Sequence, residues 1–193
     1  MNLIDYQNEV TKTVSILKKG GTILYPTDTI WGLGCDALNE KAVEKVFIVK
    51  QRPENKSLIL LVDSEEMLAN YVEYIPSITH DLLQQYNRPL TIIYPRASKR
   101  LPKEVVAADN SIAIRIVKHQ FCQDIIKQLG APIVSTSANI SGEPSPAVFA
   151  HINQKILSGV DHVVALEQNE FRSGIASTII KLEVNGEFEI IRP

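Results

Sequence analysis

Short apolar runs that read as buried strands alternate along this chain with segments of helical spacing, and this alternation most constrains its fold. The runs are bounded by glycine, proline or polar residues, as buried strands are. They lie at 22–25, 57–62, 89–94, 111–116 and 132–135. Apolar residues recur at helical spacing at 6–17, 42–47 and 121–129. Strands that alternate with helices in this way predict an α/β fold.

Signals at the ends of these segments support the prediction. Asn39 can cap the second helix, which must end near Arg52 because Pro53 disfavours helical geometry in the residue before it. Asn185-Gly186 is a strong hairpin turn between the last two strands. Further elements are expected as a helix from Ser64, a helix from Pro146 towards Ile156, and strands at 162–166 and 176–182. Hairpins and crossovers together predict a mixed parallel and antiparallel sheet flanked by helices.

The bulk composition is that of an ordinary globular protein. The chain has 193 residues, of which 45% are hydrophobic and 22% charged, and its formal net charge is −2. We therefore expect a single domain over 1–193, with a core that needs neither disulfides nor a structural metal. The charge excludes a strongly basic nucleic-acid binder but leaves room for a local basic patch.

No feature of the sequence marks the chain for a membrane or for export. The longest apolar runs fall short of the roughly 20 residues that a membrane helix needs, and residues 1–5 lack a charged leader. Cys35 and Cys122 have no Cys-x-x-Cys spacing, and the four histidines have no zinc-like spacing. We expect a reduced, cytoplasmic protein without metal-ligating residues of its own.

Two polar clusters are the candidates for chemistry. One is Lys50-Gln51-Arg52, followed by Lys56, and the other is Ser135-Thr136-Ser137-Ala138-Asn139-Ile140-Ser141-Gly142. Together they offer cations, hydroxyls and backbone N–H groups, which is what a polyphosphate such as ATP requires. The alternative for the first cluster is a solvated helix end, and for the second a polar turn.

Two further features suggest a small polar substrate. Pro26-Thr27-Asp28-Thr29 follows the first strand, where its hydroxyls and carboxylate can bind a ligand or only stabilise a turn. Arg115 interrupts an apolar strand, so it either faces solvent or binds a carboxylate in a cleft. Gly32-Leu33-Gly34 is too short for a dinucleotide fingerprint, and the sequence has no Walker-type loop.

In this order, the motifs resemble those of the YrdC-like family, and within it the TsaC-type threonylcarbamoyl-AMP synthases. The resemblance runs from about residue 20 to residue 180. Its Lys-x-Arg and Ser-x-Asn elements are quite specific to the family. The matching segments are Tyr25-Pro26-Thr27-Asp28-Thr29, Trp31-Gly32-Leu33-Gly34, Lys50-Gln51-Arg52-Pro53, Pro89-Leu90-Thr91, Ala113-Ile114-Arg115, the 135–142 segment and Ser177-Thr178-Ile179.

The resemblance implies a twisted mixed α/β sheet around a deep, positively lined cleft. It also implies a nucleotidyl transfer in which L-threonine, bicarbonate and ATP give L-threonylcarbamoyl-AMP and pyrophosphate. Mg²⁺ would be held mainly by the triphosphate. A partner complex, the tRNA threonylcarbamoyl-transferase, would then pass the group to an adenosine of tRNA.

The resemblance also implies roles for individual residues. The catalytic set would be Lys50, Arg52, Ser137 and Asn139, with the cations stabilising charge on the phosphates. ATP would be bound by Arg52, Lys56, Ser111, Ser137, Asn139 and Ser145. L-threonine would be bound by Thr29, Arg115, Ser135 and Ser177, with Arg115 clamping its carboxylate.

The chain departs from the family pattern at Leu61, Asn87, Arg88 and Val117, which bears on its strictness for threonine. Two alternatives stay open at this level. One is a non-catalytic relative that binds RNA, for which Lys99, Arg100 and Lys103 form a small basic run. The other is an enzyme that adenylates a different carbamate.

Overall fold

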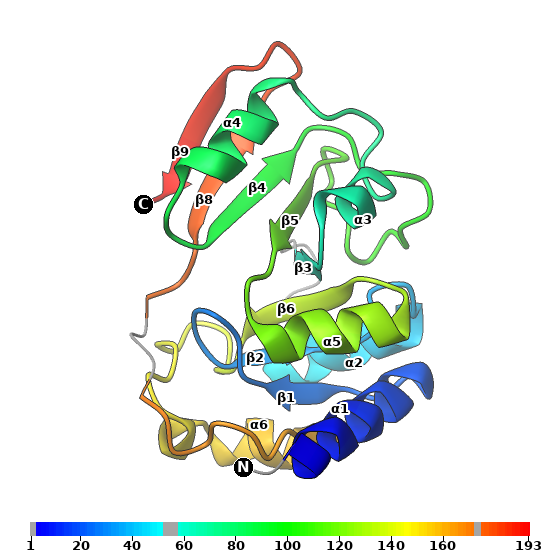
Figure 1. Cartoon of the computed structure of the whole chain (residues 1–193), viewed down its shortest axis with the longest axis vertical. Helices are drawn as coiled ribbons and strands as arrows, with labels where there is room; N and C mark the ends of the chain where they lie inside the picture. The colour runs from blue at the N-terminus through cyan, green and yellow to red at the C-terminus, as the bar shows by residue number, and fades with distance from the viewer. Residues whose placement is uncertain (1–2, 52–57, 172–174) are drawn as a thin grey trace.

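The computed structural model describes residues 3–51, 58–171 and 175–193, and in these ranges nine strands form one sheet (Figure 1). Their order across the sheet is β7-β1-β2-β6-β3-β5-β4-β8-β9. The strands are β1 (Ile23–Tyr25), β2 (Gly32–Gly34), β3 (Ile59–Val62), β4 (Leu90–Tyr94), β5 (Ile112–Ile116), β6 (Ile133–Ser137), β7 (His162–Val163), β8 (Thr178–Leu182) and β9 (Phe188–Arg192). The helices are α1 (Leu3–Lys18), α2 (Glu40–Lys50), α3 (Glu65–Ala69), α4 (Ile78–Gln85), α5 (Gln120–Leu129), α6 (Gln154–Gly159) and the 3-10 helix η1 (Phe149–His151).

The sheet combines both strand directions. The pairs β1/β7, β3/β5 and β4/β8 are parallel, whereas β1/β2, β2/β6, β6/β3, β5/β4 and β8/β9 are antiparallel. Strand β6 therefore joins the N-terminal strands to the rest of the sheet by antiparallel pairing on both of its sides. The prediction of a mixed α/β sheet flanked by helices is confirmed.

Alternation along the strands gives the central sheet two different faces. On one face, apolar side chains pack into the largest core cluster with α2, α3 and α4; from β3, β4, β5 and β8 these include Leu60, Ile92, Ile114 and Ile180. Their neighbours along the same strands point to the opposite face, where Ile59, Ile93, Ala113 and Ile179 line a cavity. Alternate residues of the same strands therefore form the hydrophobic core on one face of the sheet and the floor of the cavity on the other.

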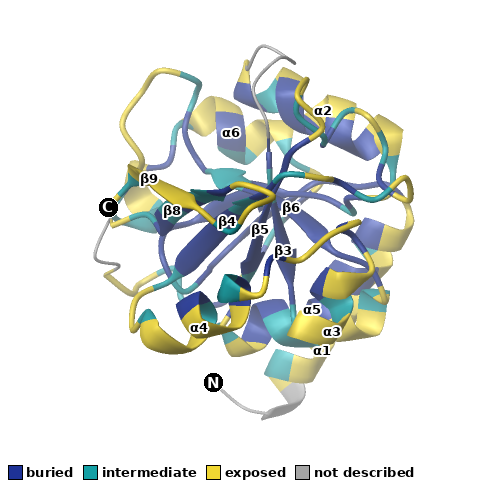
Figure 2. Ribbon diagram, turned by 90° about the horizontal axis from the view of Figure 1, so that it is seen from above, coloured by how far each residue is buried: buried dark blue, intermediate teal, exposed yellow. Residues whose placement is uncertain are grey.

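Helices cover the sheet on both sides. In Figure 2, α2 and α6 lie on one side of the sheet, and α1 and α5 lie together on the other. The α1/α5 side is closed by a second apolar cluster, which includes Val10, Leu17, Phe121, Ile125 and Leu61. None of the helices within the described ranges is both long and apolar enough to cross a bilayer.

The end signals in the sequence act as expected. The Asn39 side chain accepts a hydrogen bond from the Ala42 N–H, and α2 ends at Lys50, where Gln51 turns into the left-handed region at φ 51°. Ser64 caps α3 through the Met67 N–H. At Gly186, φ is 87°, so the chain reverses there between β8 and β9.

Two predicted elements are wrong in extent. The helix expected from Pro146 is instead η1 followed by α6, because the Asn153 side chain accepts from the Lys155 N–H and starts a new helix there. The strand expected at 162–166 is only β7, because the Ala165 N–H donates to the Glu9 carboxylate and not to a neighbouring strand.

Strand β2 was not predicted. Its glycines are required by close packing. A β-carbon on Gly34 would lie 1.9 Å from the carbonyl oxygen of Val134, so a side chain there would displace the β2/β6 pairing. Helix α4 was also not predicted.

Candidate active site

A cavity of about 340 Å³ opens on the face of the sheet that carries Ile59 and Ala113. Its walls come from the loop after β1, from strands β3 to β6, and from β8 and β9. Six of the residues predicted to bind substrates line it together: Thr29, Arg115, Ser135, Ser137, Ser145 and Ser177. The sequence motifs that carry them are scattered over most of the chain, and the sheet order brings them to one place.

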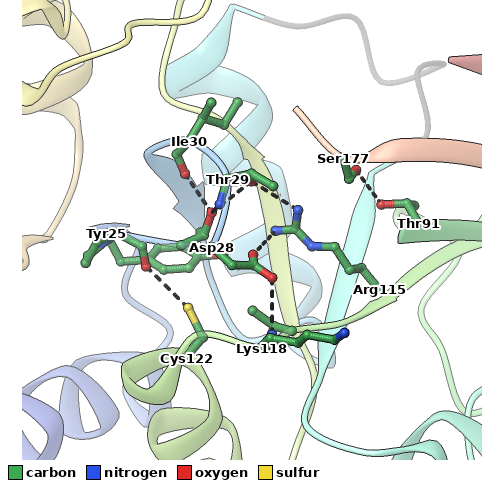
Figure 3. Close-up of polar contacts among 12 residues, drawn as sticks. Tyr25, Asp28, Thr29, Ile30, Thr91, Arg115, Lys118, Cys122 and Ser177 are labelled. Atoms are coloured by element: carbon green, nitrogen blue, oxygen red, sulfur yellow. Dashed lines mark hydrogen bonds and ion pairs between the residues drawn. The ribbon is translucent and has the colours of Figure 1, made fainter. Parts of the chain in front are cut away.

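Arg115 lies in the wall of the cavity and is only 5% exposed, so the solvent-facing alternative is wrong. Its Nη1 donates to Oγ1 of Thr29 at 3.1 Å, and its Nη2 lies 3.3 Å from Oδ1 of Asp28 (Figure 3). The other oxygen of Asp28 accepts from the Lys118 N–H at 3.2 Å. A buried guanidinium needs such partners, and these fix its orientation in the cavity wall.

Thr29 is held by the loop that follows β1. Its N–H donates to Oγ1 of Thr27, and the two threonine hydroxyls are 3.0 Å apart. The Thr27 hydroxyl also donates to the Ile30 carbonyl at 2.7 Å. The Thr-Asp-Thr motif is therefore a hydrogen-bonded turn that places the Thr29 hydroxyl beside Arg115.

Ser177 lies immediately before β8 and is buried. Its hydroxyl is 2.7 Å from that of Thr91, on the neighbouring strand β4 (Figure 3). Arg192 donates to the Ser177 carbonyl from Nε at 2.9 Å and from Nη2 at 2.8 Å. The hydroxyl and the backbone of Ser177 are thus both anchored.

Sequence reasoning missed Arg192, which also lines the cavity. Burial lowers the pKa of its guanidinium, and the charge of Arg115 lowers it further. Among the described residues that line the cavity, Arg115 and Arg192 are the charged ones. The sequence carries little signal for Arg192, because it ends a mostly exposed strand that also contains Glu189.

Lys50 lies against the 135–142 segment and is 1% exposed. Its Nζ donates to the Ser137 carbonyl at 2.6 Å and to the Asn139 carbonyl at 2.9 Å. It also reaches the Ser137 hydroxyl and the Asn139 side-chain oxygen, each at 3.2 Å. The two polar clusters therefore meet, but Lys50 and Asn139 are outside the set of described residues that line the cavity.

The remaining predicted nucleotide ligands are placed as follows. Ser145 lines the cavity, whereas Ser111 is outside the described lining and donates from Oγ to Asp109 Oδ1 at 2.6 Å. That hydrogen bond, with the Ser111 N–H, lowers the pKa of Asp109. Arg52 and Lys56 lie outside the described residues, so the predicted cationic lining of the cleft stays a prediction.

Two of the departures from the family pattern are buried away from the cavity. Leu61 pairs with Arg115 across β3 and β5, and Leu61 and Val117 are both fully buried in the α1/α5 cluster. The other two, Asn87 and Arg88, are exposed. Trp31 lines the cavity, and Cys35 lies in the core.

The described residues contain no cluster of three His, Cys, Asp or Glu side chains that could hold a metal ion.

Curated relatives give the geometry a context. The threonylcarbamoyl-AMP synthase of Xanthomonas euvesicatoria pv. vesicatoria (strain 85-10) is 35% identical over 159 residues, or 81% of this chain and 84% of that protein. The protein of the same name from Hahella chejuensis (strain KCTC 2396) is 37% identical over 155 residues, or 79% of this chain and 83% of that protein.

A solved structure and a family model agree with these relatives. The crystal structure of P. abyssi Sua5 complexed with L-threonine matches with a TM-score of 0.85 and 29% identity over 95% of this chain. This chain spans about half of that one, 53% of its length. The family model for Sua5, YciO and YrdC proteins, described as telomere recombination, matches residues 15–193. The chain therefore belongs to the Sua5/YciO/YrdC family.

Proposed function

We propose that this protein is an L-threonylcarbamoyl-AMP synthase, a nucleotidyltransferase that converts L-threonine, bicarbonate and ATP into threonylcarbamoyl-AMP and pyrophosphate. The observation that carries the proposal is the buried guanidinium of Arg115 in the wall of a cavity of about 340 Å³. Hydroxyls of Thr29, Ser135 and Ser177 line the same cavity. The synthase names of the curated relatives supply the reaction.

In this proposal, Arg115 binds the carboxylate of L-threonine. A charge-assisted contact of this kind is stronger than one between neutral groups. Thr29, Ser135 and Ser177 then offer hydroxyls to the amino and hydroxyl groups of the substrate. The support is the placement of all four residues around one cavity, together with the L-threonine complex named for the P. abyssi relative.

The chemistry begins with addition of the threonine amine to bicarbonate, which gives a carbamate and releases water. A carbamate oxygen attacks the α-phosphorus of ATP, and the bond to the leaving pyrophosphate breaks. Negative charge grows on the phosphoryl oxygens, so fixed donors and cations stabilise the transition state more than the ground state. We assign this role to the Ser137 hydroxyl and to Arg52 and Lys56, with Asn139, Ser111 and Ser145 as further nucleotide ligands.

Arg192 extends the proposed site beyond the sequence-based set. It is the second cation in the described lining, and the acceptors that anchor it belong to Ser177. A dianionic carbamate and a triphosphate together bring more negative charge than Arg115 can balance. Mg²⁺, carried in by the triphosphate, would supply further charge neutralisation.

The product would be used by a partner complex, the tRNA threonylcarbamoyl-transferase, to modify an adenosine of tRNA. We place this activity in the cytoplasm, where ATP and tRNA are available. Direct binding of tRNA would be weak, because the net charge of the chain is −2.

Pyrophosphate release tests the proposal. The protein is incubated with ATP, MgCl₂, bicarbonate and L-threonine, and parallel reactions omit one component each. We expect release to require all three substrates and to fall to background without threonine. An unchanged rate without threonine would exclude this synthase activity. Turnover that is stimulated better by another amino acid would identify a different carbamate.

A further inference from the structure

The Lys50 ammonium is enclosed by protein acceptors, although a lysine in a nucleotide-binding motif is normally expected to contact phosphate. We propose that Lys50 is a positioning residue: it holds residues 137–143, here called the 137–143 turn, in the shape that binds nucleotide. In this role its charge acts on the turn and not on the phosphates. The inference rests on the proposed function and refines it.

The first support is the number of acceptors around Nζ. An ammonium group has three protons to donate. Four oxygens of Ser137 and Asn139 lie between 2.6 and 3.2 Å from Nζ. Burying a charge is costly unless such bonds compensate for it. Contact with a phosphate would require some of these bonds to be given up.

The backbone ties the same two segments together. The Ser141 N–H donates to the Lys50 carbonyl at 2.9 Å. That carbonyl lies at the C-terminal end of α2, where helical carbonyls lack partners within the helix. The Asn139 side chain closes the turn by donating to the Glu143 carbonyl at 2.6 Å and to the Ile140 carbonyl at 3.0 Å. Lys50 therefore holds the turn through its side chain and through its main chain.

This arrangement has a consequence for Ser137, which lines the cavity. A lysine ammonium has no acceptor, so the Ser137 hydroxyl must accept in its contact with Nζ. The hydroxyl proton of Ser137 is then directed away from Lys50. It is oriented to donate to an oxygen of a ligand in the cavity.

The experiment compares Lys50→Met, Lys50→Gln and Lys50→Arg with the unmodified protein. Amide hydrogen exchange is measured without nucleotide, and ATP affinity is measured by calorimetry. Methionine removes the hydrogen-bond donors of the Lys50 side chain. Glutamine keeps two donors but carries no charge, and arginine keeps the positive charge on a planar guanidinium group. If Lys50→Met fails to fold, Lys50→Gln still tests the proposal. Amides of α5, far along the chain, report on global stability.

We expect the Ser141 amide to exchange about tenfold faster or more in Lys50→Met, while the α5 amides keep their protection. Among the three variants, those whose 137–143 turn is better protected from hydrogen exchange should bind ATP more tightly, whether or not the side chain at position 50 is charged. Lys45→Met is the matched control, because Lys45 is on the same helix, is half exposed and binds the Gly20 carbonyl. It should change neither quantity.

Two results would overturn the proposal. One is unchanged protection of the turn in all three Lys50 variants. The other is ATP affinity that follows charge, so that Lys50→Arg binds nearly normally while its turn amides exchange fast. Hydrogen exchange is measured without substrates, so its outcome does not depend on whether the proposed reaction occurs.

Discussion

Arg115 and Thr29 are joined by a hydrogen bond of 3.1 Å although 86 positions separate them in the sequence. The bond links strand β5 to the loop after β1, and these belong to different parts of the nine-stranded sheet. Because Asp28 binds the same guanidinium, the position of Arg115 depends on the whole Thr-Asp-Thr turn. The proposed threonine site is thus a product of tertiary structure.

Replacing Arg115 with alanine should raise the KM for L-threonine by about tenfold or more, since hydrogen bonds to charged groups contribute roughly 1.5–3 kcal/mol. The KM for ATP should change much less. Pyrophosphate release is measured as a function of threonine concentration. Arg100→Ala, a change in an exposed loop, is the matched control. An unchanged KM for threonine in Arg115→Ala would remove Arg115 from the substrate site.

The pair of hydroxyls formed by Thr91 and Ser177 gives a second prediction. Thr91→Val keeps the shape of the buried side chain but leaves Ser177 without this partner. We expect a loss of roughly 1–3 kcal/mol in the free energy of unfolding and a higher KM for threonine. Thr91→Ser should restore most of both. Urea denaturation and steady-state kinetics give the two quantities, and a fully active, fully stable Thr91→Val would refute the role of the pair.

Much of the fold could be predicted because its signals are local. Asn39 and Ser64 cap helices through side-chain contacts within three residues, and Asn185-Gly186 forms its hairpin turn by itself. Strands such as 111–116 were visible because their apolar runs are buried on both faces. The spacing of apolar residues along the sequence was enough to predict these elements.

The missed parts depend on contacts between distant segments. Strand β2 forms because its glycines let the Val134 carbonyl approach closely. The residues at 32–34 carry no local sequence signal for this approach. Arg192 reaches Ser177 through the β8/β9 pairing, which is irregular between Ile179 and Ile180. The end of α2 was foreseen, but whether the Lys50 ammonium faces the cavity or the 137–143 turn is decided by packing.

Gly34 provides a stability test of the sheet. Gly34→Ala should cost about 3 kcal/mol or more, because its β-carbon would meet the Val134 carbonyl at 1.9 Å. Gly186→Ala is the comparison: its β-carbon would have open space, but its φ of 87° is unfavourable, so we expect a cost of about 1 kcal/mol. Thermal or urea unfolding measures both. Equal effects of the two substitutions would contradict the close approach of β2 and β6.

The Asp109 carboxylate gives a prediction for pH. The Ser111 hydroxyl and N–H lower its pKa below the ordinary value of 3.8. The carboxylate therefore favours the folded state above that value, and its contribution is lost as the pH falls through the lower, folded-state pKa. Ser111→Ala should raise the midpoint of the Asp109 titration followed by carbon NMR. Ser158→Ala, on α6, should leave it in place, and an unmoved midpoint in Ser111→Ala would contradict the assignment.

In the proposed reaction, one cavity joins threonine, bicarbonate and ATP into a mixed adenylate. Mass spectrometry of the product made with ¹³C-bicarbonate tests it most directly. We expect a product with the mass of threonylcarbamoyl-AMP that carries one labelled carbon and disappears when threonine is omitted. Formation of AMP and pyrophosphate without any labelled adenylate, under conditions that preserve the product, would contradict it.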